Sequence, residues 1–178
     1  MINASHHYIV KFDQDWIDKA KEIRRLEDNI PGTQVFDSDH RWVGKIGEFA
    51  VEFLFLLWEP VTSHFHVASH DYLLPDKRRA EVKTKCSSYD FKEYFEFDVN
   101  DQQFRKNDND IYVACYYTLG SHEIRVVGWL PKDDVQVYGS FMKKGDLFRG
   151  KYPVTSDRWL VPYREFQPIG SLMKPIRG

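Results

Sequence analysis

A short β-strand that carries a carboxylate and an amine on one face constrains this chain more than any other feature. Within residues 80–85, Glu81 and Lys83 are two positions apart, so a strand points both side chains to the same face. The preceding segment contains Pro75-Asp76, which is a turn signal. A hairpin folded at that turn brings Asp71 level with Glu81. We therefore expect two carboxylates and one ammonium group to share a patch of a sheet.

This set of side chains has the composition of a phosphodiester-hydrolysing site. Two carboxylates, Asp71 and Glu81, can hold Mg²⁺ through oxygen ligands. Lys83 can orient or deprotonate water, or balance charge in the transition state. Ligands that offer only oxygen favour Mg²⁺ or Mn²⁺ over zinc. The motif therefore predicts metal-assisted hydrolysis, and the alternative is a surface hairpin with an incidental salt bridge.

The Asp-(x)n-Glu-x-Lys pattern resembles the PD-(D/E)XK nuclease superfamily, which has the restriction-endonuclease-like fold. The resemblance covers residues 40–118, where a Gly-x-x-Gly-Glu helix precedes the motif and a polar helix and an apolar strand follow it. One departure concerns the aspartate. The superfamily's Pro-Asp would select Asp76, but Asp76 stands only five residues before Glu81 and falls at the hairpin tip. We therefore assign the metal-binding role to Asp71, which follows His70.

The resemblance implies a further carboxylate on the preceding helix. Many members bring a helical glutamate to the metal cluster, and Glu48 in the segment 44–48 matches that position. Glu52 lies one turn further on and competes for the same role, while an ordinary polar-face position is the other alternative for Glu48. Gly47 would let the helix pack closely on the sheet.

Other residues are candidates for contact with the substrate. Several branches of the superfamily place a glutamine at the start of the helix that follows the motif, and Gln103 or its neighbour Gln102 matches it loosely. Lys85 repeats the spacing of Lys83 and would face a phosphate. Arg78 and Arg79 add positive charge near the hairpin. For each of these residues a solvated surface position is the alternative.

Composition limits the partners that this chain can have. The 178 residues are 42% hydrophobic and 16% aromatic, which suits one folded domain with a core over about 40–130, an N-terminal helix and a C-terminal extension packed on it. The net charge is −2, so a nucleic-acid surface must be a local patch. Further basic clusters are Arg105-Lys106 and Lys143-Lys144 with Arg149 and Lys151.

Two cysteines do not make a disulfide framework in a domain of this size, so Cys86 and Cys115 are expected to be free thiols in a reducing compartment. The first ten residues lack the pattern of a signal peptide. The longest apolar run, 53–58, is too short to span a membrane. We therefore expect a cytoplasmic protein, of host or phage origin, with no membrane partner.

Periodicity and breaker residues predict the order of elements. We expect an α/β fold with a central mixed β-sheet flanked by helices, and the resemblance implies a restriction-endonuclease-like core. The predicted helices cover residues 13–29, 41–58 and 100–106, with a short one near 133–134. The predicted strands cover residues 64–68, 79–86, 94–99, 111–119, 124–130 and 159–161.

These expectations lead to a Mg²⁺-dependent nuclease, with DNA as the substrate that the resemblance implies and endonuclease as the mode of cleavage. The alternatives are a non-catalytic nucleic-acid-binding module on the same fold and an RNA endonuclease. A chain of this length without a separate recognition domain is expected either to form a homodimer that cuts both strands or to nick one strand.

Overall fold

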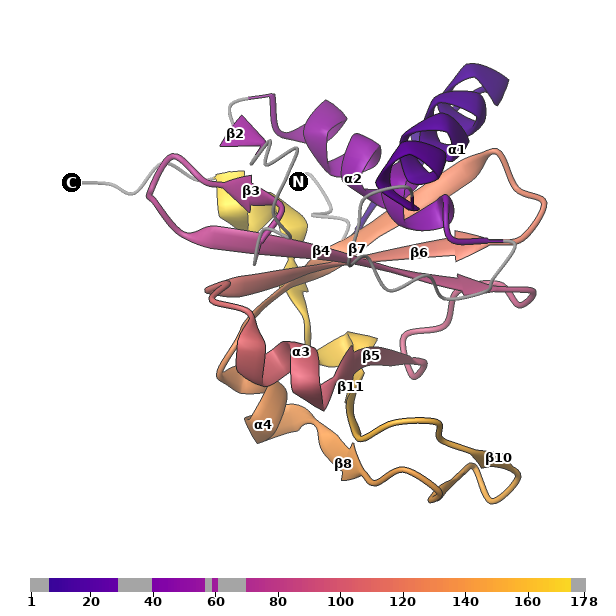
Figure 1. Cartoon of the computed structure of the whole chain (residues 1–178). Helices are drawn as coiled ribbons and strands as arrows, with labels where there is room; N and C mark the ends of the chain where they lie inside the picture. Colours follow the sequence, from indigo (N-terminus) through magenta and orange to yellow (C-terminus); the bar gives the residue numbers. More distant parts are fainter. Residues whose placement is uncertain (1–6, 29–39, 57–58, 61–69, 174–178) are drawn as a thin grey trace, which may run out of the picture.

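A seven-stranded mixed sheet organises the chain (Figure 1), and the computed structural model describes residues 7–28, 40–56, 59–60 and 70–173. The strand order is β1-β7-β6-β4-β3-β2, and β12 also pairs with β7. β4 and β6 run parallel, whereas the other pairs in this sheet are antiparallel. The strands are β1 (Tyr8–Lys11), β2 (Glu59–Pro60), β3 (Tyr72–Leu73), β4 (Arg79–Ser87), β6 (Ile111–Thr118), β7 (Glu123–Pro131) and β12 (Gln167–Pro168).

β6 lies between β4 and β7 and separates two hydrophobic cores. Its first seven residues are all buried, which confirms the central strand expected from the apolar run 111–119. Because β4 and β6 are parallel, the chain between them must cross over rather than turn back in a tight hairpin. That crossover carries β5 (Glu96–Asn100) and α3 (Asp101–Lys106), and Asn100 caps α3 by accepting a hydrogen bond from the Gln103 backbone N–H.

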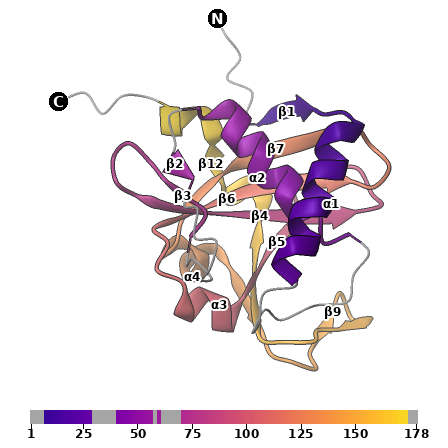
Figure 2. The same cartoon turned by 45° about the horizontal axis from the view of Figure 1, so that its top comes forward.

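Helices cover one face of the sheet. α1 (Gln14–Asp28) and α2 (Val43–Leu54) lie over β4, β6 and β7 (Figures 1 and 2). On α2, Ile46, Ala50 and Val51 are fully buried and join one core with Val82 and Val113 of the sheet. The burial of each large aliphatic side chain contributes on the order of 1.5–3 kcal/mol, so this apolar stripe holds α2 in place.

A second, smaller sheet covers the opposite face. It has the order β5-β11-β8, and Phe97 and Val99 of β5 pack with Tyr112 and Val161 in the second core. The expectation of a sheet flanked by helices is therefore only partly right, because on this face three strands form a second layer. The remaining elements are α4 (Asp134–Tyr138), β8 (Ser140–Met142), β9 (Leu147–Phe148), β10 (Tyr152–Pro153), β11 (Arg158–Pro162), η1 (Tyr163–Glu165) and η2 (Ile169–Met173).

Several boundaries differ from the sequence predictions. The helix expected over 41–58 ends at Leu54, where Phe55 leaves helical geometry. β1 was not expected, and the strand expected over 94–99 begins at Glu96. The strand expected over 64–68 lies outside the described residues. Cys86 and Cys115 are free, as expected. In the part of the chain that the structure describes, no helix has the length and apolarity to cross a bilayer.

Candidate active site

The β3–β4 hairpin has the register that the sequence predicts. Tyr72 pairs with Ala80, so Asp71 stands opposite Glu81. The Asp71 backbone N–H donates to the Ala80 carbonyl at 2.9 Å, and the Val82 backbone N–H donates to Asp71 Oδ2 at 2.7 Å. β3 covers only two residues and begins at Tyr72, so its backbone does not pair with Val82 of β4. The Asp71 side chain accepts the hydrogen bond from the Val82 N–H instead.

Asp76 lies at the hairpin tip, as predicted. Leu74 and Arg78 close the turn through a backbone hydrogen bond of 2.9 Å, and Lys77 has a φ of 70° within it. The Asp76 carboxylate accepts hydrogen bonds from the Arg78 backbone N–H at 3.1 Å and from Arg78 Nε at 2.8 Å. Asp76 therefore stabilises the turn and belongs to a different part of the hairpin from Asp71.

Glu81 and Lys83 form an ion pair on one face of β4. Lys83 Nζ donates to Glu81 Oε1 at 2.5 Å, and the two side chains are 27% and 10% exposed. The alternation of β4 turns both side chains toward the second core, because Glu81 lies beside the buried Tyr112 in the parallel β4–β6 register. Burial raises the pKa of Glu81 despite the nearby Lys83 ammonium.

α2 packs on the other face of the sheet, but its Glu48 lies within range of the charges of Asp71 and Glu81. Lys45 Nζ lies 2.8 Å from Glu48 Oε2 and 2.8 Å from Glu27 Oε1 of α1, so one lysine bridges two helices. The Tyr72 hydroxyl donates to the Glu48 backbone carbonyl at 2.9 Å, which fixes α2 against β3. Glu52, the competing candidate, is exposed.

Close packing of α2 on the sheet depends on Gly47, as the sequence suggests. A Cβ atom at Gly47 would lie 1.9 Å from Thr84 Oγ1 of β4. The absence of a side chain therefore lets α2 approach the strand that carries Glu81, and Glu48 follows directly in the chain.

Burial and mutual repulsion perturb the three carboxylates. Burial, followed by the charge of Asp71, raises the pKa of Glu48 to about 7. Burial, followed by the charge of Glu81, raises the pKa of Asp71 to about 7. The charge of Glu48 also raises the pKa of Glu81. Three acids that raise one another's pKa form one electrostatic cluster, and a cation among them would relieve the repulsion.

The donor chemistry of this cluster suits a hard divalent cation, because all three groups offer carboxylate oxygens. In the present side-chain arrangement each acid already has a partner: Val82 N–H for Asp71, Lys83 for Glu81 and Lys45 for Glu48. Among residues 7–28, 40–56, 59–60 and 70–173, no three acidic, histidine or cysteine side chains converge closely enough to hold a metal ion. Metal binding here therefore requires these side chains to exchange partners.

The arginines predicted to bind nucleic acid are engaged within the protein. Arg79 Nε and Nη2 each lie 3.0 Å from a carboxylate oxygen of Asp110, and Nη1 lies 2.7 Å from Asp108 Oδ2. The Arg78 guanidinium pairs with Asp76 and lies 5.1 Å from the centre of the Trp129 ring. Their charges are thus largely balanced, and a role in substrate binding stays a prediction.

Lys85 and Gln103 have different surroundings from the acidic cluster. Lys85 Nζ donates to the Glu96 carbonyl of β5 at 2.8 Å, and burial lowers the pKa of Lys85. The Gln103 side chain is exposed on α3, and its backbone N–H donates to Asn100 Oδ1 at 3.2 Å. Gln103 lies in the first turn of α3, where its backbone N–H is capped by Asn100. No contact is seen between its side chain and the described carboxylates of the cluster.

Sequence reasoning missed two buried polar groups beside Glu81. The side chains of Tyr112 and Asn109 are buried and interact with each other. Burial, followed by the charge of Glu81, raises the pKa of Tyr112. Tyr112 reads as an ordinary core residue in the apolar run of β6, and only its parallel pairing with Glu81 reveals the proximity. Lys45 was also missed, although it stands within the Gly-x-x-Gly-Glu segment.

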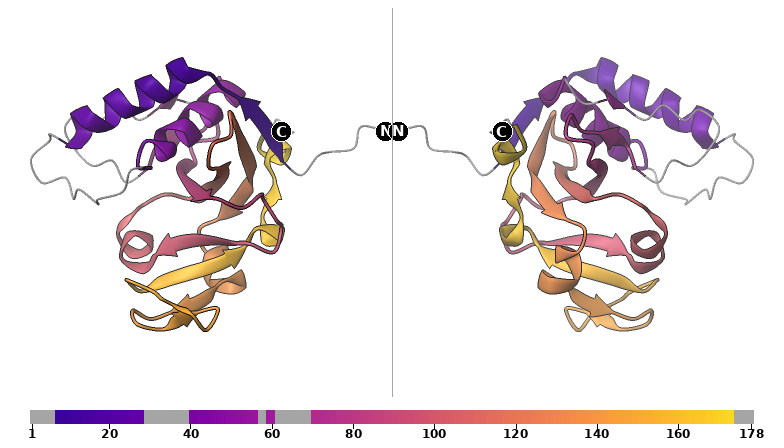
Figure 3. Two further views of the ribbon diagram at one scale, coloured as in Figure 1. Left: turned by 90° about the vertical axis from the view of Figure 1, so that its right-hand side faces the viewer. Right: turned by 90° about the vertical axis from the view of Figure 1, so that its left-hand side faces the viewer.

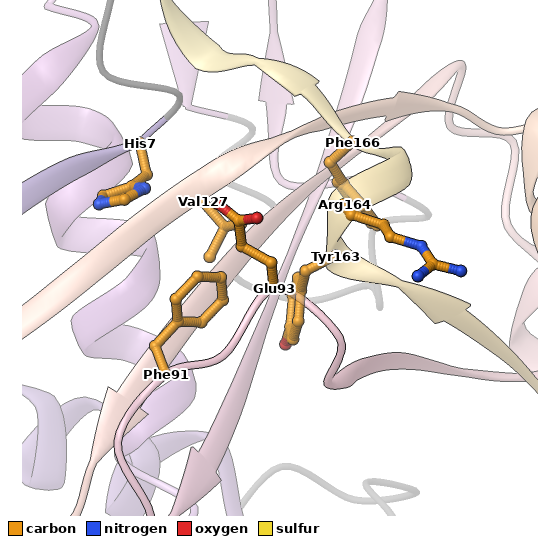
Figure 4. Close-up of a pocket in the computed structure, with 7 residues that line it drawn as sticks. All are labelled: His7, Phe91, Glu93, Val127, Tyr163, Arg164 and Phe166. Carbon is orange, nitrogen blue, oxygen red and sulfur yellow. The ribbon is translucent and has the colours of Figure 1, made fainter.

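A separate cavity of about 130 Å³ lies beside Val127 of β7 and Tyr163 and Arg164 of η1. Figure 4 shows its lining residues, none of which belongs to the acidic cluster. The lining residues are His7, Phe91, Glu93, Val127, Tyr163, Arg164 and Phe166.

Comparisons of this chain with models of protein families, with curated proteins and with solved structures found no match.

Proposed function

We propose that this protein is a divalent-metal-dependent nuclease with a restriction-endonuclease-like core, and that it acts on DNA as an endonuclease. The observation that carries the proposal is the pairing of Asp71 with Glu81 across the β3–β4 hairpin, with Lys83 bonded to Glu81 on the same strand. A helix before the hairpin and a parallel β4–β6 pair after it support the same core.

The cluster destabilises the folded protein, and this free-energy cost supports a functional role. Three carboxylates that raise one another's pKa oppose folding at neutral pH, whereas a structural ion pair would need only one of them. Acids with perturbed pKa values that are gathered on rigid elements are typical of functional sites. With all groups ionised, the three carboxylates carry three negative charges and the two lysines, Lys45 and Lys83, carry two positive charges. One negative charge is left in excess.

Each residue would have a distinct task. Asp71 and Glu81 would hold Mg²⁺ or Mn²⁺, with Glu48 as a further ligand or as a contact to bound water. The ion would supply an activated water and stabilise charge on the phosphate. Lys83 would release Glu81 and donate to the attacking water or to a phosphate oxygen, which stabilises the developing negative charge.

The test is incubation of the protein with supercoiled plasmid, linear duplex, single-stranded DNA and RNA, each with Mg²⁺, Mn²⁺ or EDTA. We expect cleavage of plasmid that requires a divalent ion and generates internal breaks. Cleavage of RNA alone would redirect the substrate assignment, and intact substrates under every metal condition would refute nuclease activity.

A matched pair of variants excludes a contaminating nuclease. Asp71→Asn keeps the size of the side chain and an oxygen acceptor for the Val82 N–H, but removes the charge. Asp76→Asn makes the same change at the hairpin tip. We expect the first variant to be inactive and the second to cleave like the wild type.

A further inference from the structure

The segment between β8 and β11, residues 143–157, forms a projecting basic arm (Figure 1, lower right; Figure 3, bottom). It contains four basic and two acidic residues, a net charge of +2, in a chain whose net charge is −2. The remainder of the chain is thus acidic, and positive charge gathers on this arm.

Three lysines of the arm differ from the arginines of the hairpin. Lys143, Lys144 and Lys151 are exposed, and no carboxylate among the described residues forms an ion pair with their amines. Arg78 and Arg79, by contrast, are paired with aspartates. The arm therefore presents amines that remain available for an anionic partner.

The acids of the arm hold its backbone instead of neutralising its lysines. Asp146 Oδ2 accepts a hydrogen bond from the Lys143 N–H at 2.8 Å, and Asp157 Oδ1 accepts one from the Lys144 N–H at 2.8 Å. Gly145 and Val154 close the base of the arm through a backbone hydrogen bond of 2.9 Å. The positions from which the lysines project are therefore fixed before any partner binds.

The tip of the arm is tied to the strand that follows the candidate active site in the chain. β9 turns into β10 through Arg149 and Gly150, whose φ angles are 51° and 67°. Arg149 Nη2 lies 2.9 Å from Glu96 Oε2, and the Glu96 carbonyl accepts the hydrogen bond from Lys85. A continuous line of contacts thus runs from Lys85, on the same face of β4 as Lys83, to the arm.

Aromatic rings add to this surface. The Arg149 guanidinium lies 5.0 Å from the centre of the Phe148 ring and 5.7 Å from that of Phe95. Tyr152, on β10, is 65% exposed. An exposed ring next to a lysine can stack on an unpaired base, while the amine contacts a phosphate.

We infer that the basic arm binds the phosphate backbone of the nucleic-acid strand that extends beyond the site of cleavage. The inference rests on the proposed nuclease function, which supplies the polyanion, and it assigns the main electrostatic contact to the arm instead of to Arg78 and Arg79.

The test measures binding in EDTA, where the probes stay intact. The wild type, an arm variant (Lys143→Ala, Lys144→Ala and Lys151→Ala together) and a control variant (Lys11→Ala, Lys19→Ala and Lys21→Ala together) are titrated against fluorescent duplex DNA, single-stranded DNA and RNA. The control makes the same change of net charge on β1 and α1. Thermal melting of all three proteins checks that each is folded.

We expect the arm variant to bind its best probe about tenfold or more weakly, and the salt dependence of log affinity to fall by about one per lysine that contacts a phosphate. The control variant should bind within about twofold of the wild type, since its lysines lie outside the inferred contact. A further variant, Tyr152→Ala, should weaken binding of single strands more than of duplex.

Equal binding by the arm variant and the wild type, or equal losses in the arm and control variants, would overturn the inference. So would a wild type that binds none of the three probes. Cleavage is scored separately with Mg²⁺. If the arm variant loses binding but the wild type cleaves no probe, the nuclease proposal is refuted and the binding role of the arm stands. If the wild type cleaves and the arm variant binds normally, the binding role of the arm is refuted and the nuclease proposal stands.

Discussion

Each acid of the cluster is held by a different kind of donor, and this makes the residues separable by mutation. Asp71 accepts from a backbone N–H, whereas Glu81 and Glu48 accept from Lys83 and Lys45. Removal of a lysine leaves a buried carboxylate without its partner, whereas an amide substitution removes charge and keeps shape. Variants at each position therefore test a different part of the proposed chemistry.

Lys83→Ala should lower the rate of cleavage by about 10²–10⁴-fold, because a positioned amine acts on the water or on the phosphate charge in the transition state. Single-turnover cleavage rates measure the loss, and binding in EDTA should change little. Lys77→Ala, at the hairpin tip, is the control. A Lys83→Ala protein that cleaves at the wild-type rate would remove Lys83 from the mechanism.

Asp71→Asn should also remove most of the stabilisation by metal. Mg²⁺ or Mn²⁺ should raise the melting temperature of the wild type, because a ligand that binds only the folded state stabilises it. In crystals with Mn²⁺, oxygens of Asp71 and Glu81 should each lie about 2–2.5 Å from one ion. An unchanged thermal shift in Asp71→Asn, or an ion bound to Asp76, would contradict the assignment.

The contacts that the sequence could predict are the local ones. The register of Asp71 with Glu81 follows from a turn signal and the period of a strand, both within eleven residues. The pairing of Arg79 with Asp108 and Asp110 could not be predicted, since these partners lie 29 and 31 residues away. Their proximity depends on the parallel β4–β6 pair, which no local pattern specifies.

At the scale of elements, the position of α2 depends on one close approach to β4. Gly47→Ala should lower the free energy of unfolding by about 1–3 kcal/mol, because the added methyl group overlaps Thr84 Oγ1. Chemical denaturation measures the change. Adding Thr84→Ala should restore most of the loss, because it removes the overlapping oxygen. Gly44→Ala, where a Cβ meets nothing within 4 Å, is the control.

Helices and strands, like single contacts, could be predicted where a local sequence pattern specifies them and not where they depend on distant partners. The strands β4, β6 and β7 were predicted because their apolar residues repeat with a clear period or form a long run. β1 and β8 cover only four and three residues and exist through pairing with distant partners. Two strands of the second sheet, β5 and β11, were predicted over 94–99 and 159–161, whereas their pairing with each other and with β8 was not.

At the scale of the whole molecule, the acidic cluster should make stability depend on pH. The pKa values of Glu48 and Asp71 are raised to about 7 in the folded protein, above about 4 in an unfolded chain. The folded state therefore binds more protons between these values, and the free energy of unfolding should fall as pH rises from about 4 to 7. Denaturation in EDTA measures this slope.

The variant Glu48→Gln with Asp71→Asn is the reference for that measurement. It should lose the part of the slope that the two acids contribute, up to about 1.4 kcal/mol per pH unit for each proton, and excess Mg²⁺ should flatten the slope of the wild type. Equal slopes in the two proteins would show that these acids are not perturbed.

Strand β7 brings the first and the last strand of the described fold together. β1 and β12 both pair with β7 on the side away from β6, β1 at residues 123–126 and β12 at residues 128–129. Beyond β12, a Cβ atom at Gly170 would lie 3.4 Å from the Tyr8 hydroxyl of β1. The two ends of the described fold thus meet on one strand. A circular permutant that joins them by a short linker and opens at the β6–β7 turn would keep every strand pair of the large sheet.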